Sequence, residues 1–238
     1  LPPGVEFVHG SVADRRVVHQ ALEGIDCIYH LAGIPHFWTA RKGELDRSNR
    51  FGTEILLQAA AAKHIRRVVH CSPESILLPK QRNGAHAVDE AVVPALEDMP
   101  GPYTRSKYLG EKAALEAGRN GMDVVVVNPT VPIGPGDRNM SPPAAMLARF
   151  LDGRSPFYLD CMLNLVDVRD LADGILLAGE KGRRGERYIL GGENIPLGNL
   201  LRLLETVSGR PMPRREIPAA LALAAGSVSE WISDRVTR

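Results

Sequence analysis

Residues 123–129 read Asp-Val-Val-Val-Val-Asn-Pro, and this stretch decides the fold class of the chain. Consecutive β-branched valines are unfavourable in a helix, because their side chains lose rotamer freedom there. A strand with valine on both faces is typical of a parallel sheet that is covered on both sides. The stretch therefore predicts a central, fully buried strand.

Shorter apolar runs on either side of this stretch alternate with helical patterns. We expect strands at residues 5–9, 26–32, 67–71, 163–166 and 188–190. We expect helices at 15–22 (capped by Asp14), in a segment that includes Ile55, Leu56 and Ala59, and at 103–119, 144–152, 170–179, 197–208 and around 219–225. This alternation predicts an α/β fold in which helices cover a parallel sheet.

The composition excludes several classes of function. The chain has 238 residues, of which 44% are hydrophobic, so it can bury a sizeable core. Its 29 basic and 28 acidic residues give a formal net charge of +1 without a basic stripe, so nucleic acid is not expected as a partner. No window approaches the ~18 consecutive apolar residues of a membrane span.

The cysteines and histidines do not form recognisable metal or disulfide patterns. Cys27, Cys71 and Cys161 lie far apart in the sequence, which predicts neither a disulfide framework nor a thiolate metal site. The seven histidines also lack metal-ligand spacing. We therefore predict no metal, and we expect a cytoplasmic location because free cysteines suit a reducing compartment.

Tyr103 and Lys107 are the first candidates for chemistry. They lie four residues apart at the start of an expected helix, so both side chains project from one face. A tyrosine hydroxyl has a pKa of about 10, and a nearby cation stabilises its phenolate, which would make Tyr103 a usable acid and base. The alternative is an ordinary amphipathic helix with an exposed lysine.

Further motifs accompany this pair in a defined order. They are His30-Leu31-Ala32-Gly33 at a strand end, Asn49-x-x-Gly52-Thr53 in the next long helix, Val68-Val69-His70-Cys71-Ser72 at the following strand end, Pro102-Tyr103 to Lys107, and Asn128-Pro129. The succession resembles the extended short-chain dehydrogenase/reductase family, also called the NAD-dependent epimerase/dehydratase family. Residues 127–135 and 185–194 look like the hopanoid-associated sugar epimerases within it, which are similar to dihydroflavonol reductases.

The resemblance implies a Rossmann-type doubly wound parallel sheet with a small C-terminal substrate-binding lobe. Residues 1–130 would form part of the dinucleotide-binding domain. Residues 131–238 would form mainly the substrate lobe, while the strand and helix at 163–180 would return to the first domain. The alternative for Asn128 and Pro129 is that they only end a strand and have no binding role.

The Gly-rich turn that binds a dinucleotide pyrophosphate does not occur in these 238 residues. We therefore expect the first strand–helix–strand unit to lie upstream of residue 1, and further sequence to follow residue 238. Without the upstream strands, residues 1–238 alone are expected to fold poorly and to bind cofactor weakly.

The resemblance also assigns roles to individual residues. Tyr103 would be the general acid and base, and Lys107 would hydrogen-bond the nicotinamide ribose and lower the pKa of Tyr103. The cofactor, NAD or NADP, would contact Leu31, Ala32, Gly33, Asn49, Tyr103, Lys107, Asn128 and Pro129. Residues 132–146 and 164–167 would shape the substrate pocket, with Pro132 and Asn164 as substrate-binding candidates.

Two positions depart from the family pattern. At one of them, relatives often carry an aspartate that contacts the adenine, whereas this chain has Ser11. The other concerns the third catalytic group. The family places a serine or threonine one position after Ser72, where it hydrogen-bonds the reacting oxygen, but this chain has Pro73, which carries no donor. Ser72 and Ser75 are the alternatives, although a displacement of one residue along a strand reverses the direction of the side chain. We retain Ser72 as the third catalytic candidate.

The implied function is an NAD(P)-dependent, epimerase/dehydratase-type oxidoreductase that acts on a nucleotide sugar or a similar carbinol or ketone. A dihydroflavonol-reductase-like ketone reductase is one alternative. Another is a non-catalytic relative that binds a dinucleotide or a partner protein on the same scaffold. The resemblance further implies a possible homodimer through the helices at 53–63 and 103–118, with a small molecule as the substrate.

Overall fold

The computed structural model describes residues 3–36, 39, 42–78 and 88–218. The chain divides into two compact units. The first contains Leu1–Thr130 and Arg169–Leu190, and the second contains Val131–Val168 and Gly191–Arg238. The helix expected around residues 219–225 lies outside the described residues.

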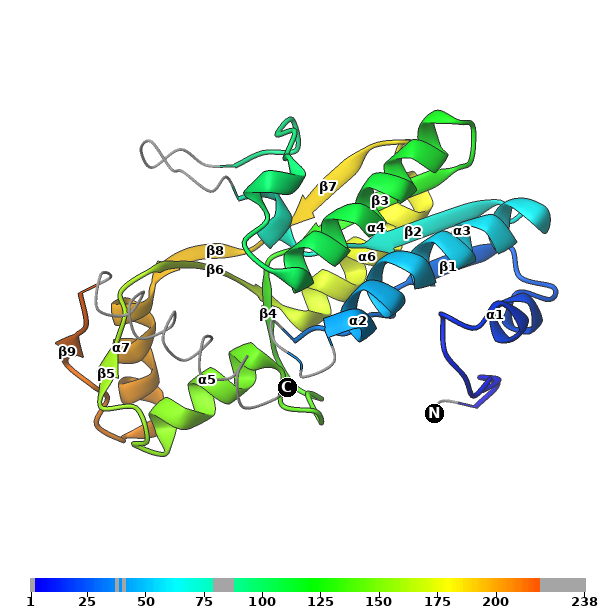
Figure 1. Ribbon diagram of the computed structural model, residues 1–238. Helices are drawn as coiled ribbons and strands as arrows, with labels where there is room; N and C mark the ends of the chain where they lie inside the picture. The colour runs from blue at the N-terminus through cyan, green and yellow to red at the C-terminus, as the bar shows by residue number, and fades with distance from the viewer. Residues whose placement is uncertain (1–2, 37–38, 40–41, 79–87, 219–238) are drawn as a thin grey trace. The chain divides into compact units, whose positions relative to one another are not determined.

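The first unit is built on a parallel sheet of four strands. Its order is β1 (Cys27–His30), β2 (Arg67–Cys71), β3 (Val124–Pro129) and β7 (Arg187–Leu190). Every residue of β3 is buried, and β3 lies between β2 and β7 in parallel register with both (Figure 1). The valine run is therefore confirmed as a central strand of a parallel sheet.

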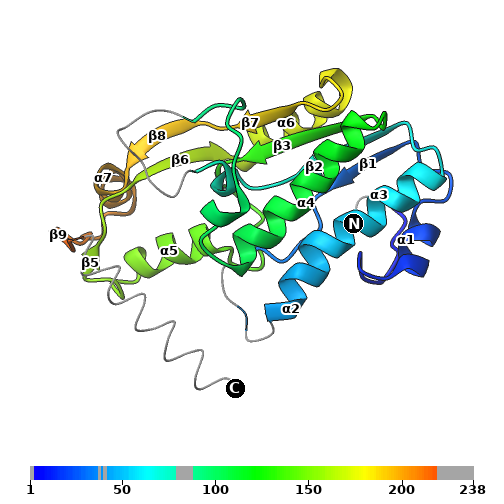
Figure 2. The ribbon, with the colours of Figure 1, turned by 45° about the horizontal axis from the view of Figure 1, so that its top comes forward.

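Helices cover both faces of this sheet. Helices α3 (Gly52–Ala62) and α4 (Pro102–Arg119) lie on one face, and α6 (Val168–Lys181) lies on the other (Figure 1, Figure 2). Helix α1 (Arg15–Ala21) begins after Asp14, whose carboxylate accepts a hydrogen bond from Arg16 N, so the expected cap is confirmed. This arrangement is the doubly wound, Rossmann-type architecture expected from the sequence.

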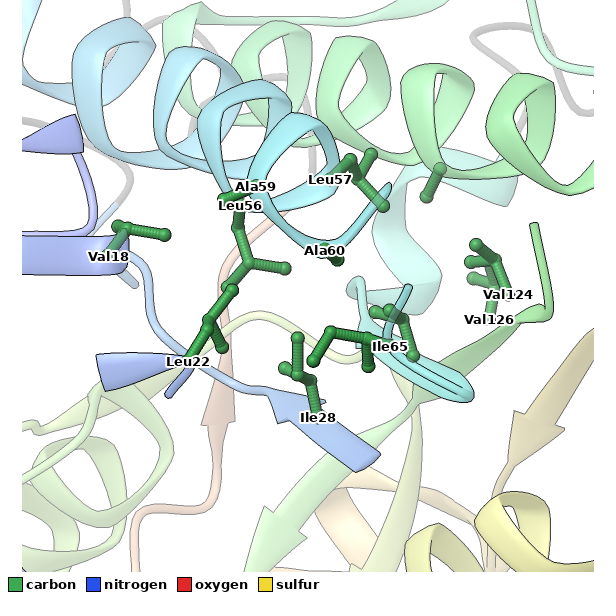
Figure 3. Close-up of a cluster of buried hydrophobic side chains, with 12 residues drawn as sticks. Val18, Leu22, Ile28, Leu56, Leu57, Ala59, Ala60, Ile65, Val124 and Val126 are labelled. Carbon is green, nitrogen blue, oxygen red and sulfur yellow. The ribbon is translucent and has the colours of Figure 1, made fainter. Parts of the chain in front are cut away.

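The alternation of side chains along β3 explains why both faces of the sheet are apolar. Val124 and Val126 belong to the buried cluster that also contains Leu56 and Leu57 of α3 (Figure 3). Val125 points to the other face, where its methyl group lies 2.7 Å from the position of a Cβ built on Gly182. A strand buried from both sides needs apolar residues at consecutive positions, as this run provides.

A π-helical turn precedes α3 and was not expected from the sequence. Helix α2 (Lys42–Leu45) runs into the turn Asp46–Phe51, which continues directly into α3. Helix α4 packs closely here, because a Cβ built on Gly110 would lie 2.7 Å from the backbone oxygen of Asn49. The turn therefore brings the Asn49 backbone against the middle of α4.

The second unit is smaller and has sheets of its own. Strand β6 (Met162–Asp167) pairs in parallel with β4 (Val131–Ile133) and antiparallel with β8 (Glu193–Pro196), while β5 (Phe157–Tyr158) pairs with β9 (Arg215–Glu216). Helices α5 (Pro142–Leu151) and α7 (Leu197–Ser208) share a core that includes Phe150, Leu200 and Leu201.

Two expectations about strands differ from the structure. Residues 5–9 form no strand. A strand requires hydrogen bonds to a neighbouring strand, and none of the sheets formed by the described residues includes this segment. Phe7 is 71% exposed. Strand β6 was expected to return to the first unit together with the following helix. It pairs instead with β4 and β8 inside the second unit, whereas α6 from Arg169 onward belongs to the first.

The contact between α4 and the π-helical turn can be tested with two glycines. Alanine normally stabilises a helix relative to glycine, by about 1 kcal/mol. At Gly110 the added methyl would collide with the Asn49 backbone, so Gly110→Ala should lower the free energy of unfolding by about 1–3 kcal/mol. Gly43→Ala in α2 meets no atom within 4 Å and should raise it. Urea unfolding of both variants measures the two changes in the free energy of unfolding. If both variants change it in the same direction, the close packing at Gly110 is contradicted.

Candidate active site

Tyr103 and Lys107 are both buried in the first half of α4. Their residual exposures are 8% and 9%. The helix begins with Pro102 at its first turn, where a missing N–H costs nothing, and Gly101 N donates a hydrogen bond to Thr104 Oγ1 at 3.2 Å. The Lys107 ammonium donates a hydrogen bond to the backbone oxygen of Cys71 at 3.0 Å. The ammonium is therefore fixed at the carboxyl end of β2.

Burial shifts the pKa values of both residues away from their ordinary values. It raises the pKa of Tyr103 to about 12, and nearby Glu74 and Cys71 act in the same direction. The pKa of Tyr103 is therefore raised and not lowered as expected, because loss of hydration outweighs any stabilisation of the phenolate by Lys107. Burial also lowers the pKa of Lys107, while Cys71 and then Glu111 oppose that change.

Asn49 ties the loop after β1 to α4. Its Oδ1 accepts a hydrogen bond from Ile34 N at 2.8 Å, and its Nδ2 donates to Ser106 Oγ at 3.0 Å. Ser106 Oγ in turn donates to the backbone oxygen of Tyr103 at 2.8 Å. Asn49 itself is 1% exposed, so its side chain acts as a buried clamp between two parts of the candidate site.

The end of β1 and its following loop reach the same place. Leu31, Ala32 and Gly33 are exposed. A Cβ built on Gly33 would lie 2.9 Å from Asn49 Oδ1 and 3.7 Å from Lys107 Nζ, so only a glycine permits this approach without displacement. The structure therefore brings together Gly33, Asn49 and Lys107, as the motif order suggested.

Asn128 and Pro129 end β3, beside the end of β2. Asn128 Nδ2 donates hydrogen bonds to the backbone oxygen of Ser72 at 3.2 Å and to Glu111 Oε2 at 2.8 Å. Its Oδ1 is buried and has no hydrogen-bond partner among the described residues. Pro129 continues the ladder opposite Leu190. This strand end therefore presents one unused acceptor, in addition to ordinary strand pairing.

The structure also reveals two polar residues that the sequence reasoning missed. Glu111 is 1% exposed, and its carboxylate lies 3.0 Å from an Arg187 nitrogen on β7. The signal for Glu111 was its position one helical turn after Lys107 on the same helix face. Arg187 gave no comparable signal, because its pairing depends on the strand order of the sheet.

Two serine hydroxyls are candidates for the function that Pro73 cannot perform. Ser72 is 0% exposed, and neither its Oγ nor that of Ser75 has a hydrogen-bond partner among the described residues. Pro73 precedes the 3₁₀ helix Glu74–Leu77. Burial raises the pKa of Glu74, which also acts electrostatically on Tyr103. The catalytic role of Ser72 stays a prediction.

Two histidines form a buried layer under this site. His30 Nε2 lies 2.9 Å from Thr53 Oγ1, and the rings of His30 and His70 lie 5.2 Å apart. Burial lowers the pKa of His30 to about 4, and the charge of Lys107 adds to this effect. Burial, His30 and Lys107 also hold the pKa of His70 well below its ordinary value. Both imidazoles are therefore neutral at neutral pH.

The two substrate candidates lie in the second unit. Pro132 pairs with Val166 in the β4–β6 register. The side chain of Asn164 spans β6 and β8: its Nδ2 donates to Asn194 Oδ1 at 2.9 Å, and its Oδ1 accepts from Gly192 N at 2.8 Å. These bonds give Asn164 a structural role within the unit, and its contact with a substrate stays a prediction.

Neither a metal-binding cluster nor a membrane-spanning helix occurs in the described ranges. No group of three or more histidine, cysteine, aspartate or glutamate side chains there could hold a metal ion. No helix in the same part of the chain is both long and apolar enough to cross a membrane.

The chain belongs to the NAD dependent epimerase/dehydratase family, whose sequence model matches residues 1–191. This confirms the family expected from the motifs, which is NAD-dependent and includes epimerases, dehydratases and reductases. A putative dihydroflavonol 4-reductase of Synechocystis is 36% identical over 236 residues, which cover 98% of this chain and 67% of the relative.

Solved structures also match this chain over most of its length. The crystal structure of gox2253 matches with a TM-score of 0.88 and 31% identity, over 98% of this chain and 70% of that one. A double mutant of DesIV, a dTDP-glucose 4,6-dehydratase from Streptomyces venezuelae solved with NAD and DAU bound, matches with a TM-score of 0.77 and 27% identity. That match covers 91% of this chain and 68% of DesIV. The chain thus spans about two thirds of the length of these relatives.

The neutral histidine layer predicts a pH dependence of stability. Between pH 6.5 and about 4 the unfolded chain binds a proton at His30 that the folded chain does not, so the free energy of unfolding falls as the pH falls through this window. The slope is roughly 1.4 kcal/mol per pH unit for one such group.

His30→Gln keeps a polar partner for Thr53 and removes this contribution, so its unfolding free energy should depend less on pH. His19→Gln, which changes an exposed histidine of α1, is the matched control and should keep the slope of the parent. Urea unfolding from pH 7 to pH 4.5 measures both. Identical slopes for parent and His30→Gln would contradict a neutral buried His30.

Proposed function

We propose that the whole protein is an NAD(P)-dependent oxidoreductase of the epimerase/dehydratase type, which acts on a nucleotide sugar or a similar carbinol or ketone. The observation that carries this proposal is the fixed, buried ammonium of Lys107, four residues after Tyr103 and beside the Gly33 loop. A lysine with only a structural role is usually exposed, because lysine is among the residues least often buried.

The residues of the chain fit the nicotinamide half of such a cofactor. The Lys107 ammonium has three donors, of which one is used by Cys71, so it can also bind a ribose hydroxyl. Asn128 Oδ1 offers a buried acceptor, and Gly33 allows close approach beside Asn49. Leu31, Ala32 and Pro129 would line the same edge of the sheet. A bound nicotinamide would supply or accept the hydride.

Tyr103 would move the proton. With a pKa of about 12 its hydroxyl is protonated at neutral pH, so the residue is ready to donate a proton to a carbonyl oxygen that is being reduced. To act as a base it needs its phenolate stabilised, which a charged Lys107 favours. Ser72 would be the third catalytic group, in place of the serine or threonine that the family carries at the position of Pro73.

A second candidate is a dihydroflavonol-reductase-like ketone reductase, for which the protonated Tyr103 would serve as the general acid. Such an enzyme requires a general acid in its forward direction, whereas epimerisation begins with removal of a proton. The name of the Synechocystis relative agrees with this alternative, and the name of DesIV agrees with a nucleotide-sugar substrate. The hopanoid-associated subgroup, the choice between NAD and NADP, and the contacts of Pro132 and Asn164 with substrate stay predictions.

The location and assembly of the protein are also proposals. The three cysteines are free, which supports the cytoplasm. A homodimer through α3 and α4 is supported by their position side by side on one face of the sheet (Figure 1). Sedimentation of the whole protein tests it, and a strict monomer would rule it out.

Substitution of the two central residues tests the enzyme proposal. In the whole protein, Tyr103→Phe should lower kcat by about 10²–10⁴-fold, the usual contribution of a general acid or base, and leave cofactor affinity unchanged. Lys107→Ala should weaken cofactor binding by about tenfold or more, because a charged hydrogen bond is lost. Fluorescence titration with NADH and NADPH and turnover assays measure these effects.

The matched control is Tyr108→Phe, which removes a hydroxyl from a partly buried tyrosine of the same helix that packs against Ile76 and Leu77. It should retain turnover. A panel of nucleotide sugars and ketones then separates epimerase from reductase. If cofactor binds but neither Tyr103→Phe nor Lys107→Ala changes any reaction, the scaffold serves binding alone and the enzyme proposal fails.

A further inference from the structure

The carboxylate of Glu111 is the most deeply buried charge connected to the candidate site. Its side chain is 2% exposed, and it lies one helical turn beyond Lys107 on the face of α4 that meets the sheet. Burial of a charge is costly unless the group is both paired and hydrogen-bonded. Glu111 meets both conditions, because it lies 3.0 Å from an Arg187 nitrogen and accepts a hydrogen bond from Asn128 at 2.8 Å.

The Asn128 amide has one possible orientation in this network. Its two neighbours, the Ser72 backbone oxygen and the Glu111 carboxylate, are both acceptors, so the nitrogen must face them. Both N–H groups are then used, and Oδ1 is the atom left without a partner among the described residues. Glu111 therefore decides which atom of Asn128 remains available.

The same region holds the backbone oxygens of Cys71, the last residue of β2, and of Ser72, which follows it. Lys107 donates to the oxygen of Cys71 at 3.0 Å, and Asn128 donates to the oxygen of Ser72 at 3.2 Å. Glu111 accepts a hydrogen bond from Asn128 and lies one helical turn from Lys107, where its charge opposes the lowering of the Lys107 pKa by burial. One buried carboxylate thus supports two neighbouring groups of the candidate cofactor site.

The ionisable groups around Lys107 identify Glu111 as its source of negative charge. His30 on β1 and His70 on β2 have lowered pKa values and are neutral at neutral pH. Burial raises the pKa of the Cys71 thiol, which is then neutral as well. Among these described neighbours, Glu111 is the anion that opposes the loss of hydration of Lys107.

We propose that Glu111 is a positioning residue, which fixes the orientation of Asn128 beside the end of β2 and keeps Lys107 in its charged form, ready to bind the cofactor. The binding of cofactor by Lys107 rests on the proposed function, and the two effects of Glu111 do not. Arg187 would hold the carboxylate in place, since the arginine also donates to the backbone oxygen of Val92 at 2.8 Å.

The protonation of Lys107 can be measured without cofactor or substrate. In the whole protein labelled with lysine carrying ¹³C at Cε, the Lys107 signal is assigned by its loss in Lys107→Arg, and its shift is followed from pH 7 to pH 11. Glu111→Gln preserves an oxygen acceptor for Asn128 but removes the charge. The titration midpoint of Lys107 should move to lower pH in this variant. Glu116→Gln makes the same change at an exposed position of α4 and should leave the midpoint unchanged.

Glu111→Gln also leaves Arg187 buried without its charge partner, which can destabilise the fold. The double variant Glu111→Gln/Arg187→Met removes both charges and should recover stability. Its Lys107 midpoint should stay lower than that of the parent, because the charge that acts on Lys107 is still absent. A midpoint equal to that of the parent in the double variant overturns the inference and leaves Glu111 a structural partner of Arg187.

Cofactor titration separates this inference from the proposed function. At an alkaline pH where Lys107 is charged in the parent and neutral in the double variant, NADH affinity should fall about tenfold, the equivalent of one charged hydrogen bond. At pH 7 the two proteins should differ less. If the Lys107 midpoint moves but no cofactor binds even to the parent, the proposed function fails and the electrostatic role of Glu111 stands. If cofactor binds with the same pH dependence in both proteins, the role of Glu111 at the cofactor site is wrong.

Discussion

Moving an ammonium group out of water costs several kcal/mol unless the protein supplies partners, and Lys107 is such a group. It meets this requirement at the carboxyl end of β2 through the backbone oxygen of Cys71 and the nearby charge of Glu111. Glu111 is a second buried charge with the same requirement, and Arg187 and Asn128 satisfy it. The need to stabilise one buried cation therefore connects α4 with β2, β3 and β7.

This connection demands close approach between backbones, which small residues permit. Gly110 lets α4 rest on the Asn49 backbone, and Gly33 lets the loop after β1 approach the side chains of Asn49 and Lys107. Asn49 then links that loop to the first turn of α4 through Ser106. Parallel strands bring their carboxyl ends to one edge of a sheet, and the buried polar groups collect at that edge. The position of the candidate site thus follows from strand direction and from glycine at two contacts.

Much of this arrangement could be predicted from the sequence because its signals are local. The valine run specified a central strand, and the spacing of Tyr103 and Lys107 specified one helix face. The pairing of Glu111 with Arg187 could not be read in this way, since it depends on β7 lying beside β3. The direction of the Tyr103 pKa was wrong for a related reason: spacing reveals a neighbouring cation, but burial exists only in the folded chain.

Burial in the folded chain also affects Ser72, the candidate to replace the hydroxyl that is missing at Pro73. Ser72 N donates to the backbone oxygen of Val127, so the parallel ladder continues one residue beyond β2. The residue before a proline is restricted to extended backbone, which agrees with this continuation. Alternation along an extended strand then places the Ser72 side chain on the face of His70, the face that α3 and α4 cover. A hydroxyl in that buried layer, at 0% exposure, can support the residues of α4, and the catalytic contact proposed for Ser72 stays a prediction. In the proposed reaction, direct contact with the reacting oxygen would be made first by Tyr103, which is 8% exposed.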